Sequence, residues 1–263
     1  MTMPSRSPTG IVIVAISTLA FSYLLLPLLV IVVSPLGDTG YLAFPPQGLT
    51  SKWYSAAIGD ARYVTSFLVS LHIAVVSAAI AGTIGVLGAY GLTRYEFPGR
   101  KLLEATFLSP LILPSLVLAV SLTIFFTRTG LLSGSWRLIG AHVVVCTPYV
   151  LRVSLPVLRK FDRTLEDAAR SLGATTIQTF FLVVLPVVRP GVVAGTVLAF
   201  ITSFDEVVLA LFLADPGAPT LPVTIYSAVQ LGFEPPVAAV SGILVLVTLG
   251  LMIIYQISGA LRR

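Results

Sequence analysis

The sequence predicts an all-α integral membrane protein with six transmembrane helices. Hydrophobic residues make up 56% of the 263 positions and charged residues only 10%, whereas charged residues make up about 25% of an average soluble domain. Long apolar runs alternate with short polar loops along the chain. A soluble core cannot hide this much apolar surface, so lipid must cover part of it. The lipid bilayer is therefore the first partner that the sequence predicts.

The apolar runs place the six predicted spans at residues 11–33, 64–93, 102–127, 138–158, 190–213 and 235–261. The first run is longer than the apolar region of a signal peptide, and no small-residue cleavage site follows it, so we expect a retained helix. Gly82 and Gly85 in the second run favour close packing of helices. Pro110 and Pro114 are expected to kink or interrupt the third span.

The distribution of Lys and Arg predicts the orientation in the membrane. Six spans place both termini on one side. That side holds Arg6, Arg94, Arg100, Lys101, Arg152, Arg159, Lys160, Arg163, Arg170, Arg189, Arg262 and Arg263. The other side holds only Lys52, Arg62, Arg128 and Arg137. Because cytoplasmic loops carry the excess of basic residues, we expect both termini in the cytoplasm. The net charge of +5 then reflects topology, and no nucleic-acid partner is expected.

The sequence lacks the residues of the common catalytic sites. The single cysteine, Cys146, excludes an internal disulfide and a cysteine-based zinc site. His72 and His142 are far apart in apolar surroundings, which is typical of packed or pore-side histidines. No phosphate-binding loop, zinc-protease motif or nucleophile elbow is present. We therefore expect neither an enzyme nor a bound metal or cofactor.

Residues 164–190 form a polar stretch between two apolar runs, on the side predicted to be cytoplasmic. Thr164 and Asp167 have the spacing of a capping box at the start of a helix. Gly173 stands where a left-handed residue ends a helix. Thr175 and Gln178 repeat the capping spacing. The pattern predicts two short helices, and the dipeptide Leu185-Pro186 is expected to end the stretch.

The first of these helices is predicted to be amphipathic. Its apolar positions share one face, and they are Leu165, Ala168, Ala169 and Leu172. The small alanines would let a partner approach the backbone closely, and Glu166 offers a charge near the helix start. The pattern alone leaves two other interpretations open. The segment could be an amphipathic helix that lies in the lipid interface, or it could be a plain loop.

The segment from Glu166 to Gly173, followed by Leu185-Pro186, resembles the EAA loop of bacterial ABC importer permeases. That loop reads Glu-Ala-Ala, three residues, Gly, and then a hydrophobic residue before Leu-Pro. Asp167 here takes the place of the usual first alanine. The longer match, which ends at Ser203-Phe-Asp-Glu206, is similar to the second permease of the spermidine/putrescine importer group.

This resemblance implies a type I ABC importer (MetI-like) fold in a single permease domain, residues 1–263 with a core at 64–261. It implies a cytoplasmic coupling loop at 164–186 that docks onto an ATPase, whose closure moves the loop as a lever. The residues that carry this coupling would be Glu166, Asp167, Ala168, Ala169 and Gly173. The implied partners are a second permease subunit of different sequence, two ATP-binding subunits that hold the ATP, and an extracytoplasmic solute-binding protein. The implied location is the bacterial inner membrane.

Two adjacent acids, Asp205 and Glu206, lie about 15 residues into the predicted fifth span. An acid inside the membrane costs about 2.5–3.5 kcal/mol and usually faces a cavity or a partner. We expect one of the two to attract a cationic substrate along the pathway, with polar contacts from Ser203 and Tyr226. The alternative is a structural pair with Arg or Lys of a neighbouring helix.

The leading hypothesis is a transport subunit for a small amine-bearing solute, with a polyamine such as spermidine or putrescine first. The resemblance leaves amino acids, opines and aminophosphonates open as other solutes. A self-sufficient secondary transporter would show inverted repeats, and no clear halves are visible. An intramembrane enzyme would need paired catalytic groups, and only Asp205 and Glu206 offer any.

Overall fold

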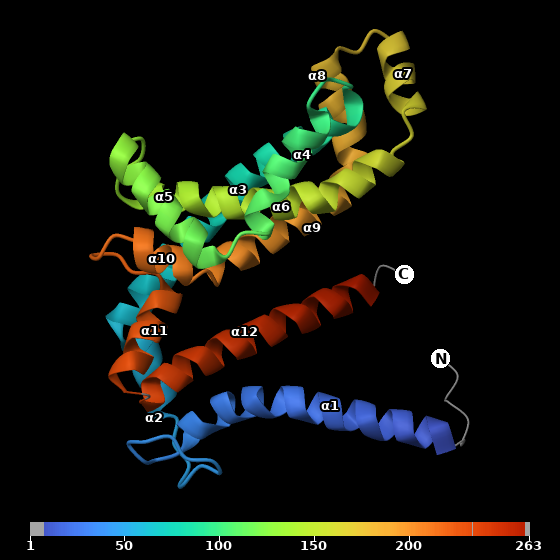
Figure 1. Cartoon of the computed structure of the whole chain (residues 1–263). Coiled ribbons are helices and arrows are strands. Elements are labelled where there is room, and N and C mark those ends of the chain that lie inside the picture. The colour runs from blue at the N-terminus through green and yellow to red at the C-terminus, as the bar shows by residue number, and fades with distance from the viewer. Residues whose placement is uncertain (1–7, 233, 261–263) are drawn as a thin grey trace. The chain divides into compact units, whose positions relative to one another are not determined.

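The computed structural model describes residues 8–232 and 234–260, and every regular element within them is a helix. Three residues counted in the predicted charge asymmetry, Arg6, Arg262 and Arg263, lie outside this part. Contacts divide the chain into two compact units. The terminal unit comprises residues 1–64 and 224–263, and the central unit comprises residues 65–223. Figure 1 shows the order of the helices from the N-terminus to the C-terminus.

Four helical segments in the described part are long and apolar enough to cross a membrane. They are Thr9–Leu36, which includes α1 (Pro8–Val33), α3 (Ala61–Arg94), α6 (Ser135–Lys160) and Thr176–Phe204, which includes α9 (Leu185–Phe204). A bent pair of helices makes a fifth candidate. The sixth predicted span corresponds to α12 (Pro235–Ala260), whose 26 residues reach about 39 Å at 1.5 Å per residue. The helices are thus compatible with the six predicted spans.

The bent pair confirms the predicted interruption of the third span. Helices α4 (Arg100–Leu108) and α5 (Ser115–Thr129) meet at an angle of 106°. The short 3-10 turn η2 (Ser109–Leu111) contains Pro110, and Pro114 precedes the first residue of α5. Both prolines lack the N–H that a continuous helix needs, so the chain changes direction where they stand.

In the terminal unit, α1, α12 and α2 (Lys52–Gly59) pack together. The Trp53 Nε1–H donates to the carbonyl of Gly37 at 3.0 Å, and the Tyr54 hydroxyl donates to the carbonyl of Val32 at 2.6 Å. These bonds tie α2 to the end of α1 and to the 3-10 turn η1 (Ser34–Leu36). The segment between the first two apolar runs therefore contains a short helix, and its aromatic side chains fix its position.

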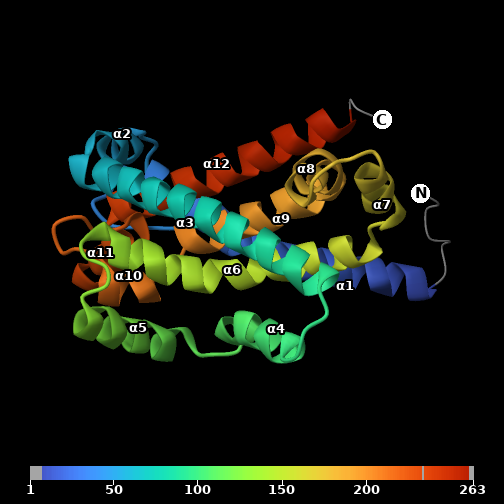
Figure 2. The same cartoon turned by 90° about the horizontal axis from the view of Figure 1, so that it is seen from above.

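The central unit is built on α3, α6 and α9, which run beside one another in both views (Figures 1 and 2). Val150 of α6 is fully buried. A Cβ atom added to Gly85 of α3 would lie 2.7 Å from the Val150 side chain, and one added to Gly195 of α9 would lie 3.0 Å from the Val150 Cα. Both glycines are thus needed for the close approach, which confirms the packing role predicted for Gly85.

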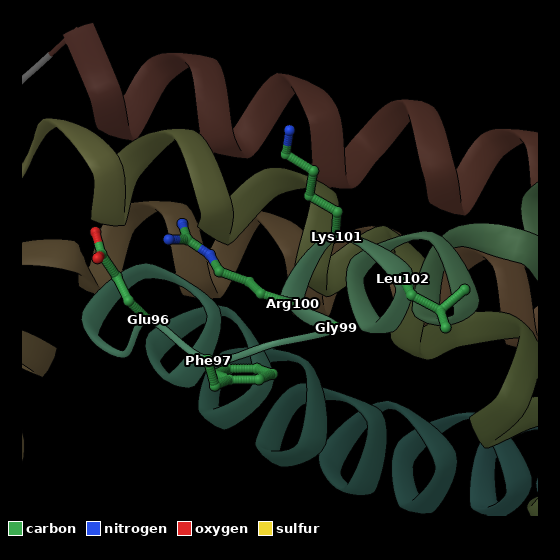
Figure 3. A pocket seen from close by; sticks show the side chains of 6 residues that line it. All are labelled: Glu96, Phe97, Gly99, Arg100, Lys101 and Leu102. Carbon is green, nitrogen blue, oxygen red and sulfur yellow. The ribbon is translucent and has the colours of Figure 1, made fainter.

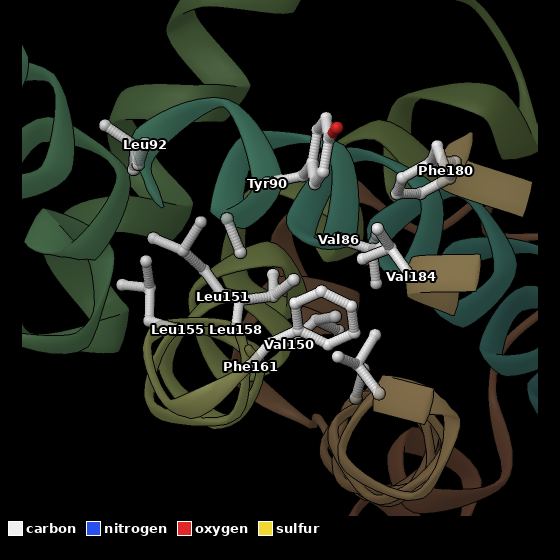
Figure 4. Close-up of a cluster of buried hydrophobic side chains, with 14 of the residues drawn as sticks. Val86, Tyr90, Leu92, Val150, Leu151, Leu155, Leu158, Phe161, Phe180 and Val184 are labelled. Carbon is white, nitrogen blue, oxygen red and sulfur yellow. The ribbon is translucent and has the colours of Figure 1, made fainter. Parts of the chain in front are cut away.

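The larger hydrophobic cluster of this unit joins α3, α6, α9 and the π-helix η3 (Phe180–Val184). Figure 4 shows Tyr90 of α3 close to Phe180, with Leu151 and Leu158 of α6 on the other side of the cluster. The Tyr90 and Phe180 rings meet edge to face, with 4.9 Å between centroids. This cluster fixes the end of the bundle from which the polar stretch 164–175 extends.

A second cluster packs α10 (Val208–Leu213) against α5, α6 and α3. It includes Phe126, Leu138 and Leu209, all buried. Helix α11 (Leu221–Leu231) follows, and its first backbone N–H donates to the Ser70 hydroxyl at 2.8 Å. The cluster therefore anchors the short helix that comes directly after Asp205 and Glu206.

The predicted boundary at Leu185-Pro186 is wrong. Helix α8 (Thr176–Thr179), the π-helix and α9 follow one another without a break as far as Phe204. Pro186 lies in the first turn of α9, where a residue without an N–H is tolerated, and the wider π turn comes directly before it. The fifth apolar segment consequently begins before residue 190, inside the stretch that the sequence predicted to be cytoplasmic.

Candidate functional site

Helix α7 (Thr164–Ser171) lies between α6 and α8, and its start differs from the predicted capping box. Thr164 is the first helical residue, and no side chain of the predicted pair caps the helix. Instead the Asp162 Oδ1 atom accepts the Thr164 N–H at 2.9 Å. This hydrogen bond lowers the pKa of Asp162, because it favours the ionised carboxylate. The predicted capping box is wrong because the Thr164 N–H, which Asp167 would have to accept, is bonded to Asp162.

The end of α7 agrees with the sequence. Gly173 has φ +91°, the left-handed conformation that favours glycine. The Ala174 N–H donates to the carbonyl of Ala169 at 3.1 Å. Thr175 and Gln178 form a reciprocal capping box, with distances of 2.8 Å and 3.3 Å. The predicted division of the stretch at Gly173 is therefore confirmed, whereas the second helix is longer than predicted because it continues to Phe204.

One side of α7 and of Leu172, which directly follows it, is exposed and carries apolar side chains; it is here called the outer face. Leu165 is 45% exposed and Leu172 is 90% exposed, and Ala168 between them is exposed as well. Asp167 adds one exposed carboxylate beside these side chains. The outer face thus consists of Leu165, Asp167, Ala168 and Leu172. An apolar patch with a charged edge is typical of a surface that contacts another molecule.

Glu166, which was predicted to offer its charge to a partner, points into the chain. The residue is only 4% exposed. Its Oε1 atom accepts a charge-assisted hydrogen bond from Arg94 Nε at 2.5 Å, and the Tyr90 hydroxyl donates to its Oε2 atom at 3.3 Å. Both partners belong to α3. The carboxylate of Glu166 is therefore used inside the chain, in bonds to two residues of α3.

The burial of Glu166 also corrects the register of the resemblance. The pattern Glu-Ala-Ala, three residues, Gly, counted back from Gly173, falls on Asp167, Ala168 and Ala169. Asp167 thus takes the place of the glutamate, and Glu166 precedes the pattern. This register agrees with the structure, because Asp167 and Ala168 are the residues that face outward.

Arg94 joins the ends of several elements of the central unit. Besides Glu166 it contacts α6, since its Nη1 donates to the carbonyl of Leu158 at 3.2 Å. Its guanidinium lies over the rings of Tyr90 and Phe161, at 5.6 Å and 5.3 Å from the centroids. Its Nη2 has no partner among the residues that the structure describes. Sequence reasoning counted Arg94 only as a topology signal and missed this role.

The two adjacent acids lie at a break between helices and not on a continuous helix. Helix α9 ends at Phe204, and the Asp205 N–H still donates to the carbonyl of Ile201 at 3.1 Å. The Glu206 Oε1 atom accepts the N–H groups of Val208 and Leu209 at 2.9 Å and 3.2 Å. Glu206 therefore caps α10. The predicted fifth span, residues 190–213, is thus interrupted at these two acids.

The other predicted pathway residues have different surroundings. Asp205 is exposed, and its carboxylate has no hydrogen bond or ion pair to any residue in the described part. Ser203 is buried, and its Oγ lies 2.7 Å from the Nδ1 of His142. Tyr226 is 45% exposed on α11 and belongs to the terminal unit. Asp205 is thus the one residue of the four that offers a free charge.

The two histidines differ in burial. His142 is 1% exposed, and its Nε2 has no partner within the described residues. His72 is exposed on α3. Within residues 8–232 and 234–260, no three of His, Cys, Asp and Glu come together as a metal site would require. Cys146 is buried, and its thiol donates to the carbonyl of Ala199 at 3.2 Å.

A pocket of about 490 Å³ lies at the loop between α3 and α4. Figure 3 shows its lining, which combines the acid Glu96 with the bases Arg100 and Lys101 around Gly99. None of the residues predicted for coupling or for the pathway lines it. Glu96 lies in the loop, whereas Arg100 and Lys101 are the first two residues of α4.

The chain was compared with known families and proteins. Residues 81–262 match the family described as binding-protein-dependent transport system inner membrane component. The spermidine/putrescine transport system permease protein PotC of Escherichia coli K12 is 33% identical over 240 residues, which cover 91% of this chain and 90% of PotC. The putrescine transport system permease protein PotI of the same organism is 33% identical over 244 residues, which cover 90% of this chain and 85% of PotI.

Among solved structures, the chain is similar to one from a bacterial ABC transporter involved in the import of the acidic polysaccharide alginate. The TM-score is 0.75 and the alignment covers 99% of both chains, although only 18% of the residues are identical. At this identity the likeness shows a shared fold.

Proposed function

Because the chain belongs to the family of binding-protein-dependent transport system inner membrane components, we propose that it forms the import path for a polyamine. The chain is a multi-pass permease subunit of an ABC importer and carries out no hydrolysis itself. The proposal concerns the solute, the partners, the orientation and the roles of individual residues.

The polyamine assignment rests on the two relatives PotC and PotI, whose names state spermidine and putrescine. An alkyl polyamine is a flexible cation, so a path for it needs a carboxylate or aromatic groups near water. Asp205 supplies such a carboxylate, because it is exposed and its charge is not used by any described residue. It follows a helix break, and non-helical backbone within a membrane protein is tolerated where it lines a cavity or is buried in protein. We assign to Asp205 the attraction of the cation.

Other small amine-bearing solutes remain alternatives. An amino acid, an opine or an aminophosphonate carries an ammonium group that Asp205 would also attract. Each of these also carries an acidic group, which a lone carboxylate would repel. This repulsion favours a substrate with positive charge only.

The coupling role belongs to the outer face of α7. This role is supported by the different exposure of two side chains. Leu172 on the outer face is 90% exposed, whereas Glu166 of α7 is 4% exposed and is bonded to α3. A helix with an exposed apolar stripe fits a groove on a protein partner. We propose that this partner is the ATP-binding subunit, with Asp167, Ala168 and Ala169 in the contact and Gly173 as the turn that ends it.

The orientation that we propose places α7 and both termini in the cytoplasm. The C-terminal end of α6 and α7 itself carry Arg159, Lys160, Arg163 and Arg170, whereas the opposite end of α6 is flanked by Arg128 and Arg137. The excess of basic residues on the α7 side supports a cytoplasmic location in the bacterial inner membrane. The complete importer would then contain a second permease of different sequence, two ATP-binding subunits and an extracytoplasmic binding protein.

A competition experiment tests the substrate. Labelled putrescine is supplied to proteoliposomes that contain the full complex and ATP, with each unlabelled competitor added in excess. We expect spermidine to suppress uptake, and neutral amino acids, opines and aminophosphonates to leave it unchanged. Uptake that is insensitive to polyamines but is suppressed by one of the other solutes would assign the chain to that solute instead.

A further inference from the structure

Helix α7 is joined to its neighbours by short non-helical segments at both ends. Phe161 leaves the helical conformation at the end of α6, with ψ 131°, and Gly173 has a positive φ after α7. Such segments allow a helix to pivot. The angle of α7 therefore depends on side-chain contacts. These include the ion pair between Glu166 and Arg94 and a hydrogen bond from Arg163, directly before α7, to the carbonyl of Thr93.

The Arg94–Glu166 pair is well suited to fix an angle. Both side chains are buried, with exposures of 8% and 5%. The pair links positions 72 residues apart in the sequence. A planar guanidinium with a fixed set of donors restrains the orientation of the carboxylate that it binds. The ring of Phe161 and the hydroxyl of Tyr90 complete the enclosure. Burial also keeps salt from screening the pair.

The attachment point lies on a helix that contacts the rest of the central unit. Arg94 is the last residue of α3. The same helix packs against Val150 of α6 through Gly85, and against Thr196 of α9 through Gly82. Helix α9 ends next to Asp205. Close-packed contacts thus join α3 to the helix that precedes the proposed pathway carboxylate.

We propose that Arg94 and Glu166 are positioning residues that fix α7 to α3, so that a force on the outer face of α7 moves α3 with it. The transfer of force rests on the proposed coupling function. The fixation of α7 stands apart from it and can be tested on the full chain alone. Neither residue contacts the substrate or ATP in this account.

The first measurement follows amide hydrogen exchange of residues 164–173 in the full chain in lipid nanodiscs. Glu166→Gln and Arg94→Met each break the pair, and the double variant Arg94→Met/Glu166→Met removes both charges, so it folds without an unpaired buried charge. The matched control is Glu104→Gln, which breaks the more exposed bridge from α4 to Arg159 at 2.9 Å and does not involve α7. We expect exchange in 164–173 to become about tenfold faster in the three pair variants and to stay unchanged in the control.

The second measurement compares uptake with ATP hydrolysis in the reconstituted complex. In the pair variants, we expect ATP hydrolysis to continue while the solute transported per ATP falls roughly 2- to 30-fold. If the pair only stabilised the fold, its loss would lower the yield of complex and leave the ratio of transported solute to hydrolysed ATP constant. The Glu104→Gln control is expected to keep the wild-type ratio.

The outcomes separate the two proposals. Unchanged exchange of 164–173 in a folded double variant would overturn the fixation of α7. Faster exchange with a wild-type transport ratio would overturn the transfer of force. If the wild-type complex transported nothing with ATP, the proposed function would fail, and the exchange measurement would still decide whether the pair fixes α7.

Discussion

At the scale of single residues, Asp205 and Glu206 are adjacent acids with different tasks. The Glu206 carboxylate accepts two backbone N–H groups at the start of α10, so its charge is partly used by the protein. The Asp205 carboxylate has no such partner within the described residues. A carboxylate that forms no bonds within the protein is free to bind a cationic ligand in place of solvent. A hydrogen bond to a charged group contributes about 1.5–3 kcal/mol.

Replacement of each acid by its amide tests this division. Asp205→Asn removes the charge, and we expect the KM for putrescine uptake to rise about tenfold, which corresponds to about 1.4 kcal/mol. Glu206→Gln keeps an oxygen that can still cap α10, and we expect a change of less than about threefold in KM. Uptake kinetics in proteoliposomes measure both. Equal KM values for Asp205→Asn and the wild type would remove Asp205 from the pathway.

The roles of single residues were only partly predictable from the sequence. The positive φ of Gly173 and the capping box of Thr175 and Gln178 follow from short-range patterns, and both were predicted. The direction of Glu166 was not, because it depends on Arg94, which lies 72 residues earlier. Periodicity gives the face of a helix on which a side chain lies, and it does not say which face the rest of the chain covers.

At the scale of elements, α7 presents its apolar stripe outward, so substitution on that stripe should affect the partner and leave the fold intact. We expect Leu172→Asp to weaken binding of the ATP-binding subunit by more than about tenfold, because a charge would replace a central apolar contact. Co-purification of the ATP-binding subunit with the variant chain measures this binding.

A control for Leu172→Asp is Leu131→Asp. Leu131 is 66% exposed in the loop between α5 and α6, at the opposite end of α6 from α7. This variant should retain the complex. If Leu172→Asp also retains the complex, the stripe does not bind the ATPase, and the interpretation of α7 as a helix in the lipid interface takes its place.

The packing of α3 against α6 gives a second prediction at this scale. A Cβ atom at position 85 would lie 2.7 Å from the Val150 side chain, whereas a Cβ atom at position 91 of the same helix has no atom within 4 Å. We expect Gly85→Ala to destabilise the chain by about 1–3 kcal/mol through overpacking. Gly91→Ala should be neutral or stabilising by up to about 1 kcal/mol, because alanine favours helix. Thermal unfolding in detergent measures both, and equal effects of the two substitutions would contradict the packing described for Gly85.

The helices could be predicted from the sequence where a long apolar run or a proline determines the local backbone conformation. Pro110 and Pro114 break the third segment as expected. The helix end predicted at Leu185-Pro186 is wrong, because proline is tolerated in the first turn of a helix. The π turn directly before it also lets the preceding helix continue. A proline can follow the end of one helix or stand in the first turn of the next, and the sequence alone does not distinguish the two cases.

At the scale of the whole molecule, composition was sufficient to predict an all-helical membrane protein, because a charged fraction of 10% leaves too few polar groups to cover a soluble domain. The family resemblance added the importer class, which the matched family confirms. The division into a terminal and a central unit was not predictable. The runs of α1 and α3 are both long and apolar enough to span a membrane. The small residues of α3 favour close packing, and they do not say which helices share its core.

The central claim is that this chain transports only when partner subunits hydrolyse ATP. The most direct test measures labelled putrescine uptake into proteoliposomes that contain either the full complex or this chain alone, with ATP or ADP on the side of the ATP-binding subunits. We expect uptake by the full complex with ATP and none in the other three conditions. Uptake by the chain alone would contradict the account, because it would show a self-sufficient transporter.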